Sequence, residues 1–97
     1  MARFIRKGVA LFLCMAATLS AQAQTEIQWW HSMGGALGEW VNDLAQDFNK
    51  TQSQYKVVPV FKGSYDESMT AAIAAFRAGN APHILQVFEV GTATMMA

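Results

Sequence analysis

Short runs of β-branched and aromatic residues recur along the chain, separated by turn-forming residues. They lie at residues 25–30, 55–61 and 83–88, and their length and composition predict three β-strands. Pro59 has no backbone N–H, so the second strand is expected at an edge of the sheet or loosely paired there. Trp29 and Trp30 point to opposite faces of the first strand, which predicts that at least one of them lies in the core.

Two segments with helical spacing separate these runs. The first carries a single apolar stripe made of Leu37, Trp40, Val41, Leu44 and Phe48. The second starts at a Ser64-x-x-Glu67 capping box, and Gly79 is expected to end it in the left-handed conformation. Its predicted core face consists of Met69, Ile73 and Phe76. Residues 89–91 predict a tight exit from the third strand, and residues 92–97 the start of another helix.

The order β-α-β-α-β predicts an α/β fold, in which parallel strands are joined by right-handed crossovers. A parallel sheet needs helices on both faces, and two helices with a short third one barely supply them. The architecture alone therefore predicts the first part of a longer protein.

The first 23 residues have the three parts of a secretory signal peptide. Arg3, Arg6 and Lys7 form a basic start, residues 8–19 are uncharged and apolar, and residues 21–23 read Ala-Gln-Ala. The apolar run has 12 residues, too few for a membrane span of about 20. Cys14 lies within this run after Leu13, where a lipoprotein acceptor would follow a small residue. We therefore predict cleavage after Ala23 and export to a bacterial envelope compartment.

Removing the leader changes the charge from zero to about −3, because seven acidic but only four basic residues follow it. The chain after the leader lacks the clustered basic residues of a nucleic-acid-binding face. The one cysteine lies in the leader, which excludes a disulfide scaffold. The remaining 74 residues are near the lower limit for a self-sufficient core.

The sequence offers little for catalysis or metal binding. His31 and Ser32 are adjacent, which by itself gives no nucleophile–base geometry, and no G-x-S-x-G elbow is present. The two histidines are 52 positions apart, without the spacing of a metal site, and we expect neither metal nor cofactor. In the loop 31–38, the glycines follow neither a dinucleotide-binding nor a P-loop pattern, and shaping the turn is their favoured role over anion binding.

Tyr65 and Glu89 are the candidate binding residues. Tyr65 begins the second helix just after a strand, and Glu89 lies at the carboxyl end of the third strand. Ligands of open parallel sheets bind in the crevice beyond these strand ends, so both residues can face one ligand. A tyrosine hydroxyl beside free helix amides suits an oxyanion, and a carboxylate suits hydroxyl or ammonium donors. The alternatives to ligand binding are that Tyr65 packs as part of a hydrophobic staple at the start of the helix and that Glu89 is a solvated turn residue.

Several segments resemble one known family. The patterns are IxxWHSM (27–33), AQxFN (45–49), KxVP (56–59), KGxY (62–65) and, most densely, AxIAAFRxGNAPxILQVxEVGTATMMA (71–97). They are similar to the glycerol-3-phosphate-binding members of extracellular solute-binding protein family 1, which are periplasmic receptors of ABC importers. The resemblance covers nearly all residues after the leader.

This resemblance implies the first part of lobe one, residues 24–97, of a two-lobed type II periplasmic-binding-protein-like fold. The implied ligands are glycerol 3-phosphate and glycerophosphodiesters, and the implied partner is the inner-membrane permease of an importer. In the family, the tyrosine of KGxY contacts phosphate and the glutamate of QVxEVG contacts the glycerol hydroxyls, which points to Tyr65 and Glu89. The receptor is expected to be a monomer and not an enzyme.

The chain departs from the family pattern in two ways. Gly34 and Ala36 replace expected acidic residues, and Phe61 and Phe88 stand where tyrosine is common. Family members are also several times longer, so we expect a truncated receptor that is inactive alone. A sugar receptor of the same fold and a secreted α/β hydrolase fragment that uses Ser32 or His31 are the alternatives.

Overall fold

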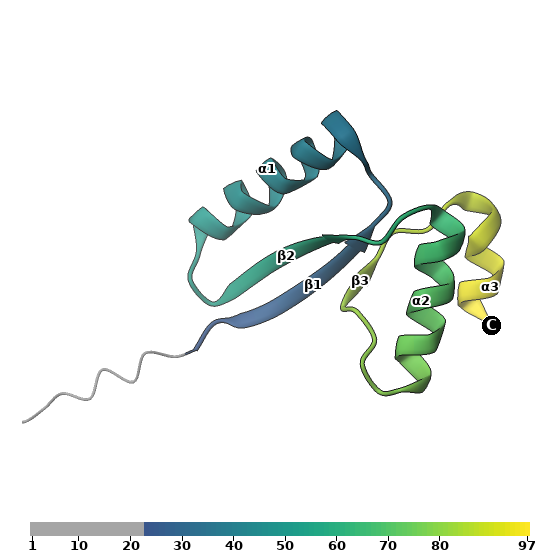
Figure 1. Ribbon diagram of the computed structural model, residues 1–97. Helices are drawn as coiled ribbons and strands as arrows, with labels where there is room; N and C mark the ends of the chain where they lie inside the picture. Colours follow the sequence, from purple (N-terminus) through teal and green to yellow (C-terminus); the bar gives the residue numbers. More distant parts are fainter. Residues whose placement is uncertain (1–22) are drawn as a thin grey trace, which may run out of the picture.

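The computed structural model describes residues 23–97, which form a small parallel sheet with helices on both faces (Figure 1). The predicted leader and its apolar run, residues 1–22, lie outside the described part. The element order is β1 (Thr25–His31), α1 (Gly35–Thr51), β2 (Tyr55–Phe61), α2 (Tyr65–Arg77), β3 (Ile84–Leu85), η1 (Glu89–Gly91) and α3 (Thr92–Met96). The predicted α/β order is therefore confirmed.

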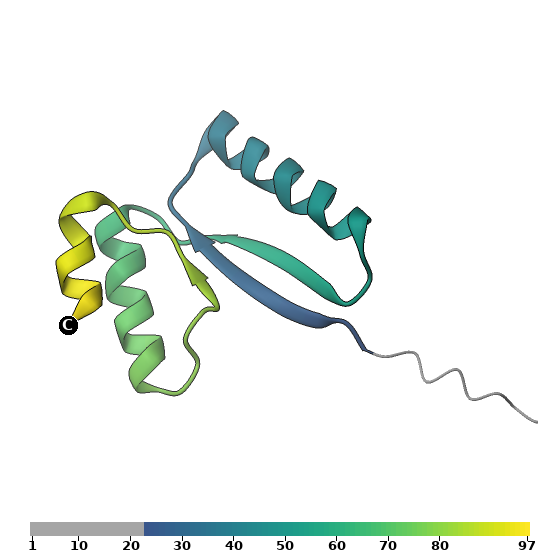
Figure 2. The same cartoon turned by 180° about the vertical axis from the view of Figure 1, so that it is seen from behind.

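The three strands are parallel in the order β2-β1-β3, so β1 is central (Figure 2). β1 pairs with β2 from Thr25↔Tyr55 to His31↔Phe61, whereas β1 and β3 share only Trp29↔Ile84 and Trp30↔Leu85. β2 is an edge strand, as Pro59 predicts.

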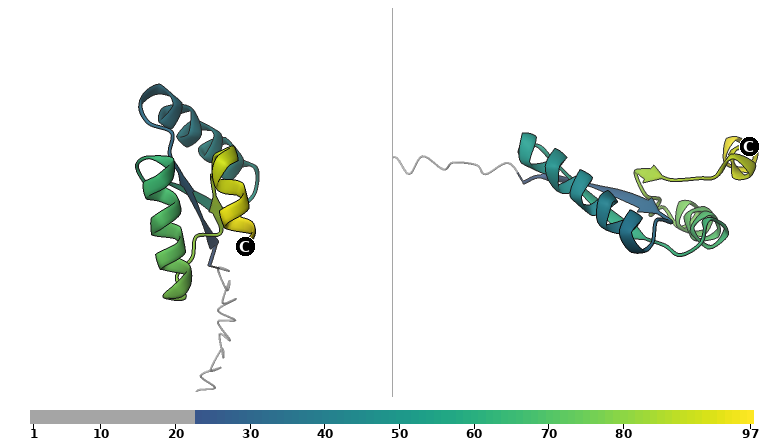
Figure 3. Two further views of the ribbon diagram at one scale, coloured as in Figure 1. Left: turned by 90° about the vertical axis from the view of Figure 1, so that its right-hand side faces the viewer. Right: turned by 90° about the horizontal axis from the view of Figure 1, so that it is seen from above.

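Helices α1 and α2 cover opposite faces of this sheet. Leu44 and Phe48 of α1 line one hollow with Trp29 and Ile84, whose side chains share one face of the sheet. α2 lies toward the other face, and Ile73, Phe76 and Met95 are among the residues that line a second hollow with Leu85. α2 and α3 lie at the same end of the molecule (Figure 3). This arrangement follows from the topology, because the two crossovers leave β1 and β2 in opposite directions with the same hand.

The buried residues are mostly small, and two predictions about the helix faces are wrong in part. α1 meets the sheet through Val41 and Ala45, which are 1% and 3% exposed. The other members of the predicted stripe remain 45–60% exposed, namely Leu37, Trp40, Leu44 and Phe48. The stripe has the predicted spacing, but no described element packs over most of it. The adjacent tryptophans behave as expected, with Trp30 buried in the core.

On α2, the buried positions are Ser68 and Ala72, which are 0% and 4% exposed. α2 therefore meets the sheet through small side chains, and the predicted core residue Phe76 is 75% exposed. Met69 and Ile73 flank the contact and are half-buried.

The predicted ends of α2 are confirmed. Ser64 is the N-cap, and its Oγ accepts the Glu67 N–H at 3.2 Å. The reciprocal capping-box bond is not among the hydrogen bonds of residues 23–97, where the Glu67 carboxylate instead lies against Gly63. At the other end, Gly79 has φ +79°, and the Asn80 N–H donates to the Ala75 carbonyl oxygen at 2.8 Å, which completes a Schellman motif.

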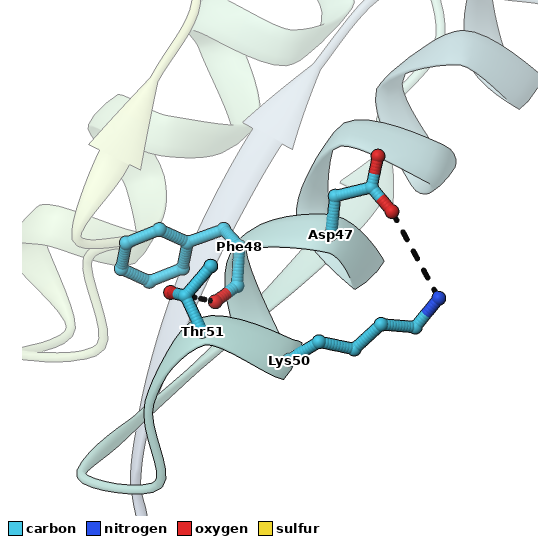
Figure 4. A network of polar contacts seen from close by, with 4 residues as sticks. All are labelled: Asp47, Phe48, Lys50 and Thr51. Carbon is cyan, nitrogen blue, oxygen red and sulfur yellow. Dashed lines mark hydrogen bonds and ion pairs between the residues drawn. The ribbon is translucent and has the colours of Figure 1, made fainter.

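Figure 4 shows two polar contacts at the carboxyl end of α1. Lys50 Nζ lies 3.8 Å from Asp47 Oδ1, and the Thr51 hydroxyl donates to the Phe48 carbonyl oxygen at 2.6 Å. Both charged side chains are more than 70% exposed, so this ion pair contributes little to stability.

No helix within residues 23–97 combines the length and apolarity that a membrane span requires.

The third strand is shorter than the predicted 83–88 run, because β3 contains only Ile84 and Leu85. Side chains continue its pairing with β1 at both ends. His83 Nδ1 accepts the Gln28 N–H at 3.0 Å, and Gln86 Oε1 accepts the Ser32 N–H at 3.0 Å. The chain then leaves the sheet and reaches η1, the tight exit predicted for residues 89–91.

Candidate functional site

The carboxyl ends of all three strands lie at one edge of the sheet, and the candidate residues follow these ends. Tyr65 is the first residue of α2, shortly after β2, and Glu89 is the first residue of η1, shortly after β3. The strand order changes direction at β1, so the loops after β1 and β3 border the crevice where open parallel sheets bind ligands.

Phe88 links the two segments that carry the candidate residues. Its ring packs against the Tyr65 ring with centroids 5.3 Å apart and an angle of 37° between the planes. Glu89 follows Phe88 directly, so its backbone is one residue away from this aromatic contact with the first residue of α2. The sequence alone gave Phe88 no role, because the partners of the stack are 23 positions apart in the chain.

The polar ends of Tyr65 and Glu89 are unused within residues 23–97. The Tyr65 hydroxyl takes part in no hydrogen bond of this part of the chain, and Glu89 forms no ion pair there. Ser64 caps α2 through the Glu67 N–H, and the positive end of the helix dipole lies next to Tyr65. Tyr65 therefore has a hydroxyl donor, and Glu89 a carboxylate acceptor, that no contact within residues 23–97 uses.

Lys62 places a positive charge on the same side of the sheet. Its Nζ lies 3.9 Å from the centroid of the Trp30 ring, and its backbone N–H donates to the His31 carbonyl oxygen at 2.9 Å. A cation held over an indole face keeps its charge while its position is restricted. Lys62 is not predicted as a functional residue from the sequence, because its contact with Trp30 depends on the pairing of β1 with β2.

His31 is a structural residue in this arrangement. It is 3% exposed, its Nδ1 accepts the Met33 N–H at 3.1 Å, and its ring lies 6.0 Å from the rings of Trp29 and Phe61. Burial lowers the pKa of His31 below its ordinary value of 6.5. Since Met33 occupies Nδ1, and the Ser32 hydroxyl is buried without a partner in the described chain, the pair shows no nucleophile–base contact.

Glycines shape the connection between β1 and α1. Gly35 has φ +56°, which favours glycine, and a Cβ on Gly38 would lie 2.6 Å from the Met33 carbonyl oxygen. These two positions support the turn-shaping interpretation. α1 begins at Gly35, so the loop is shorter than the predicted 31–38 segment. Within residues 23–97, no group of three or more histidine, cysteine or acidic residues is placed to hold a metal ion.

Comparison with known proteins relates this geometry to one group of receptors. No protein-family model matches the chain. A Yersinia enterocolitica protein named sn-glycerol-3-phosphate-binding periplasmic protein UgpB is 58% identical over 94 residues, which are 96% of this chain and 21% of the relative. UgpB of Pectobacterium atrosepticum is 56% identical over 93 residues, and UgpB of Salmonella typhimurium is 58% identical over 90 residues. These matches cover 96% and 93% of the chain, and 21% and 20% of the relatives.

The chain is homologous to the sn-glycerol-3-phosphate-binding periplasmic proteins. It spans about a fifth of the length of these UgpB relatives. The partial parallel sheet agrees with the periplasmic-binding-protein-like lobe predicted from the sequence.

Proposed function

We propose that this chain is part of lobe one of a periplasmic receptor that binds sn-glycerol 3-phosphate and glycerophosphodiesters. The receptor delivers its ligand to the permease of an ABC importer, acts as a monomer and performs no catalysis. The observation that supports this proposal is the contact of Tyr65 with Phe88, the residue before Glu89, in a chain 58% identical to a UgpB protein. Export by a leader cleaved after Ala23 would place the receptor in the periplasm.

The proposed contacts follow from the chemistry of each group. The Tyr65 hydroxyl donates a hydrogen bond to a phosphate oxygen, close to the amino-terminal end of α2, which attracts anions. The Glu89 carboxylate accepts hydrogen bonds from the glycerol hydroxyls. Lys62 adds local positive charge to a body whose net charge is about −3, and so favours approach of an anion. The second lobe of the receptor supplies the remaining contacts.

The test uses a full-length chimera, because this chain spans about a fifth of its relatives. In the chimera, the present chain replaces the matching part of the Yersinia enterocolitica UgpB. Calorimetry with glycerol 3-phosphate should give Tyr65→Phe and Glu89→Gln variants that bind about 10- to 100-fold more weakly, as expected for lost hydrogen bonds to charged groups.

Matched controls are available at the opposite end of the same sheet. Tyr55→Phe and Glu26→Gln make identical chemical changes at the amino ends of β2 and β1, and should leave affinity unchanged. Unaltered affinity in both Tyr65→Phe and Glu89→Gln would refute the site assignment. A chimera that retains a sugar but not glycerol 3-phosphate would instead support the sugar receptor of the same fold.

A further inference from the structure

Gln86 occupies an unusual position beside the candidate site. Its backbone N–H donates to the Trp30 carbonyl oxygen at 2.9 Å, and its side-chain Oε1 accepts the Ser32 N–H at 3.0 Å. One residue thus bonds to two successive polar groups along the edge of β1. The side-chain oxygen takes the place of a backbone carbonyl, so Ser32, the first residue after β1, remains paired where β3 has already ended at Leu85.

Because a side chain and not the backbone makes this hydrogen bond, residues 86–88 do not have to continue along β1. A strand continued by backbone bonds would keep residues 86–88 extended along β1. Because Gln86 makes the last bond with its side chain, its own carbonyl and the next residues can turn away from the sheet. Two residues later, Phe88 reaches the Tyr65 ring, and Glu89 begins η1.

We propose that Gln86 is a positioning residue for ligand binding, which ties the loop after β1 to the loop after β3 and thereby sets the place of Glu89. This inference rests on the proposed function, since it gives Gln86 a role through a proposed ligand contact. The bond is half-buried, and therefore less weakened by competing water than a surface bond. Gln86 itself touches no ligand in this proposal.

The main test compares two substitutions in the full-length chimera. Gln86→Met keeps the length of the side chain but removes the acceptor oxygen, and should weaken glycerol 3-phosphate binding about three- to tenfold. Gln86→Glu retains an acceptor for the Ser32 N–H and should preserve most of the affinity. Amide hydrogen exchange at Ser32 should accelerate in Gln86→Met but not in Gln86→Glu.

Coupling to Glu89 separates positioning from a general structural role. If Gln86 acts through Glu89, then Gln86→Met should have a much smaller effect on affinity when Glu89→Gln is already present. Equal effects in both backgrounds would overturn the proposal. His83→Phe removes the equivalent acceptor at the other end of β3, so it should lower stability without this coupling. Ser32→Ala should leave the hydrogen bond to Gln86 intact, because this bond uses the Ser32 backbone N–H.

The possible failures are distinguishable. Lack of glycerol 3-phosphate binding by the unsubstituted chimera would overturn the proposed function and the role of Gln86 with it. Unchanged affinity in Gln86→Met, with accelerated exchange at Ser32, would overturn only the role of Gln86.

Discussion

The two edges of β1 are held in different ways. Along β2, seven register pairs from Thr25↔Tyr55 to His31↔Phe61 form a regular backbone ladder. Along β3, only two pairs are present, and the side chains of His83 and Gln86 accept the flanking N–H groups of Gln28 and Ser32. The backbone ladder depends little on residue identity, whereas the β3 edge adds two particular side chains to the backbone bonds that His83 and Gln86 donate to Gln28 and Trp30.

The difference has a consequence for function. A regular ladder gives a rigid edge, while a strand finished by side chains can end early and send its chain toward a ligand. The proposed contact on the β2 side, Tyr65, begins the 13-residue helix α2, and the one on the β3 side, Glu89, begins the three-residue helix η1. The substitutions below test whether the two edges differ in this way.

The largest effect is expected from breaking the backbone ladder. The Val57 N–H donates to Asn49 Oδ1 on the outer side of β2, and the Lys62 N–H donates to β1, so the Val58 N–H faces β1 by alternation. Val58→Pro removes this donor and should lower the free energy of unfolding of the chimera by at least about 2 kcal/mol. Urea unfolding followed by circular dichroism measures the change.

Two neighbouring substitutions control for other causes. Val58→Ala shortens the same side chain but keeps the N–H, and should cost clearly less than Val58→Pro. Pro59→Ala changes a position whose amide faces away from β1, so it should alter stability by no more than about 1 kcal/mol. Similar losses in Val58→Pro and Val58→Ala would contradict a dominant role for the ladder.

The β3 edge should respond to a change of side chain alone. His83→Phe keeps an aromatic ring but leaves the Gln28 N–H without its acceptor, which should cost about 1 kcal/mol of unfolding free energy. His83→Asn places an amide oxygen near the position of Nδ1 and should recover much of that loss. The backbone bond from the His83 N–H to the Gln28 carbonyl oxygen at 3.1 Å is present in all three proteins. If Asn and Phe were equally destabilising, the side-chain hydrogen bond would make no contribution at this end of β3.

Whether a feature depends on nearby or distant residues explains which predictions from the sequence are confirmed and which are wrong. Ser64 and Gly79 mark the ends of α2 correctly because caps depend on residues a few positions apart. The length of the third strand was wrong because its ends are set by bonds that span 55 and 54 positions, between His83 and Gln28 and between Gln86 and Ser32.

Burial and the site were predicted unequally for similar reasons. The spacing of the α1 stripe located the helix, but burial depends on which element packs over it, and only Val41 of the stripe is buried. Topology alone brought Tyr65 and Glu89 to one edge, since parallel strands end together. The Phe88 stack and the Gln86 bond were missed because they depend on how the loops meet in three dimensions.

The smallest expected effect is a pH dependence at the end of the regular edge. His31 ends β1 against Phe61, and burial lowers its pKa in the folded protein below 6.5. As the pH falls below about 6.5, the unfolded chain takes up a proton that folded His31 resists, so stability decreases toward lower pH and is retained above this range. The urea midpoint of the chimera at pH 5.5 and 7.5 measures this slope. His31→Asn keeps an acceptor for the Met33 N–H but cannot titrate, so its slope should be shallower. Equal slopes in the two proteins would mean that His31 does not cause the pH dependence.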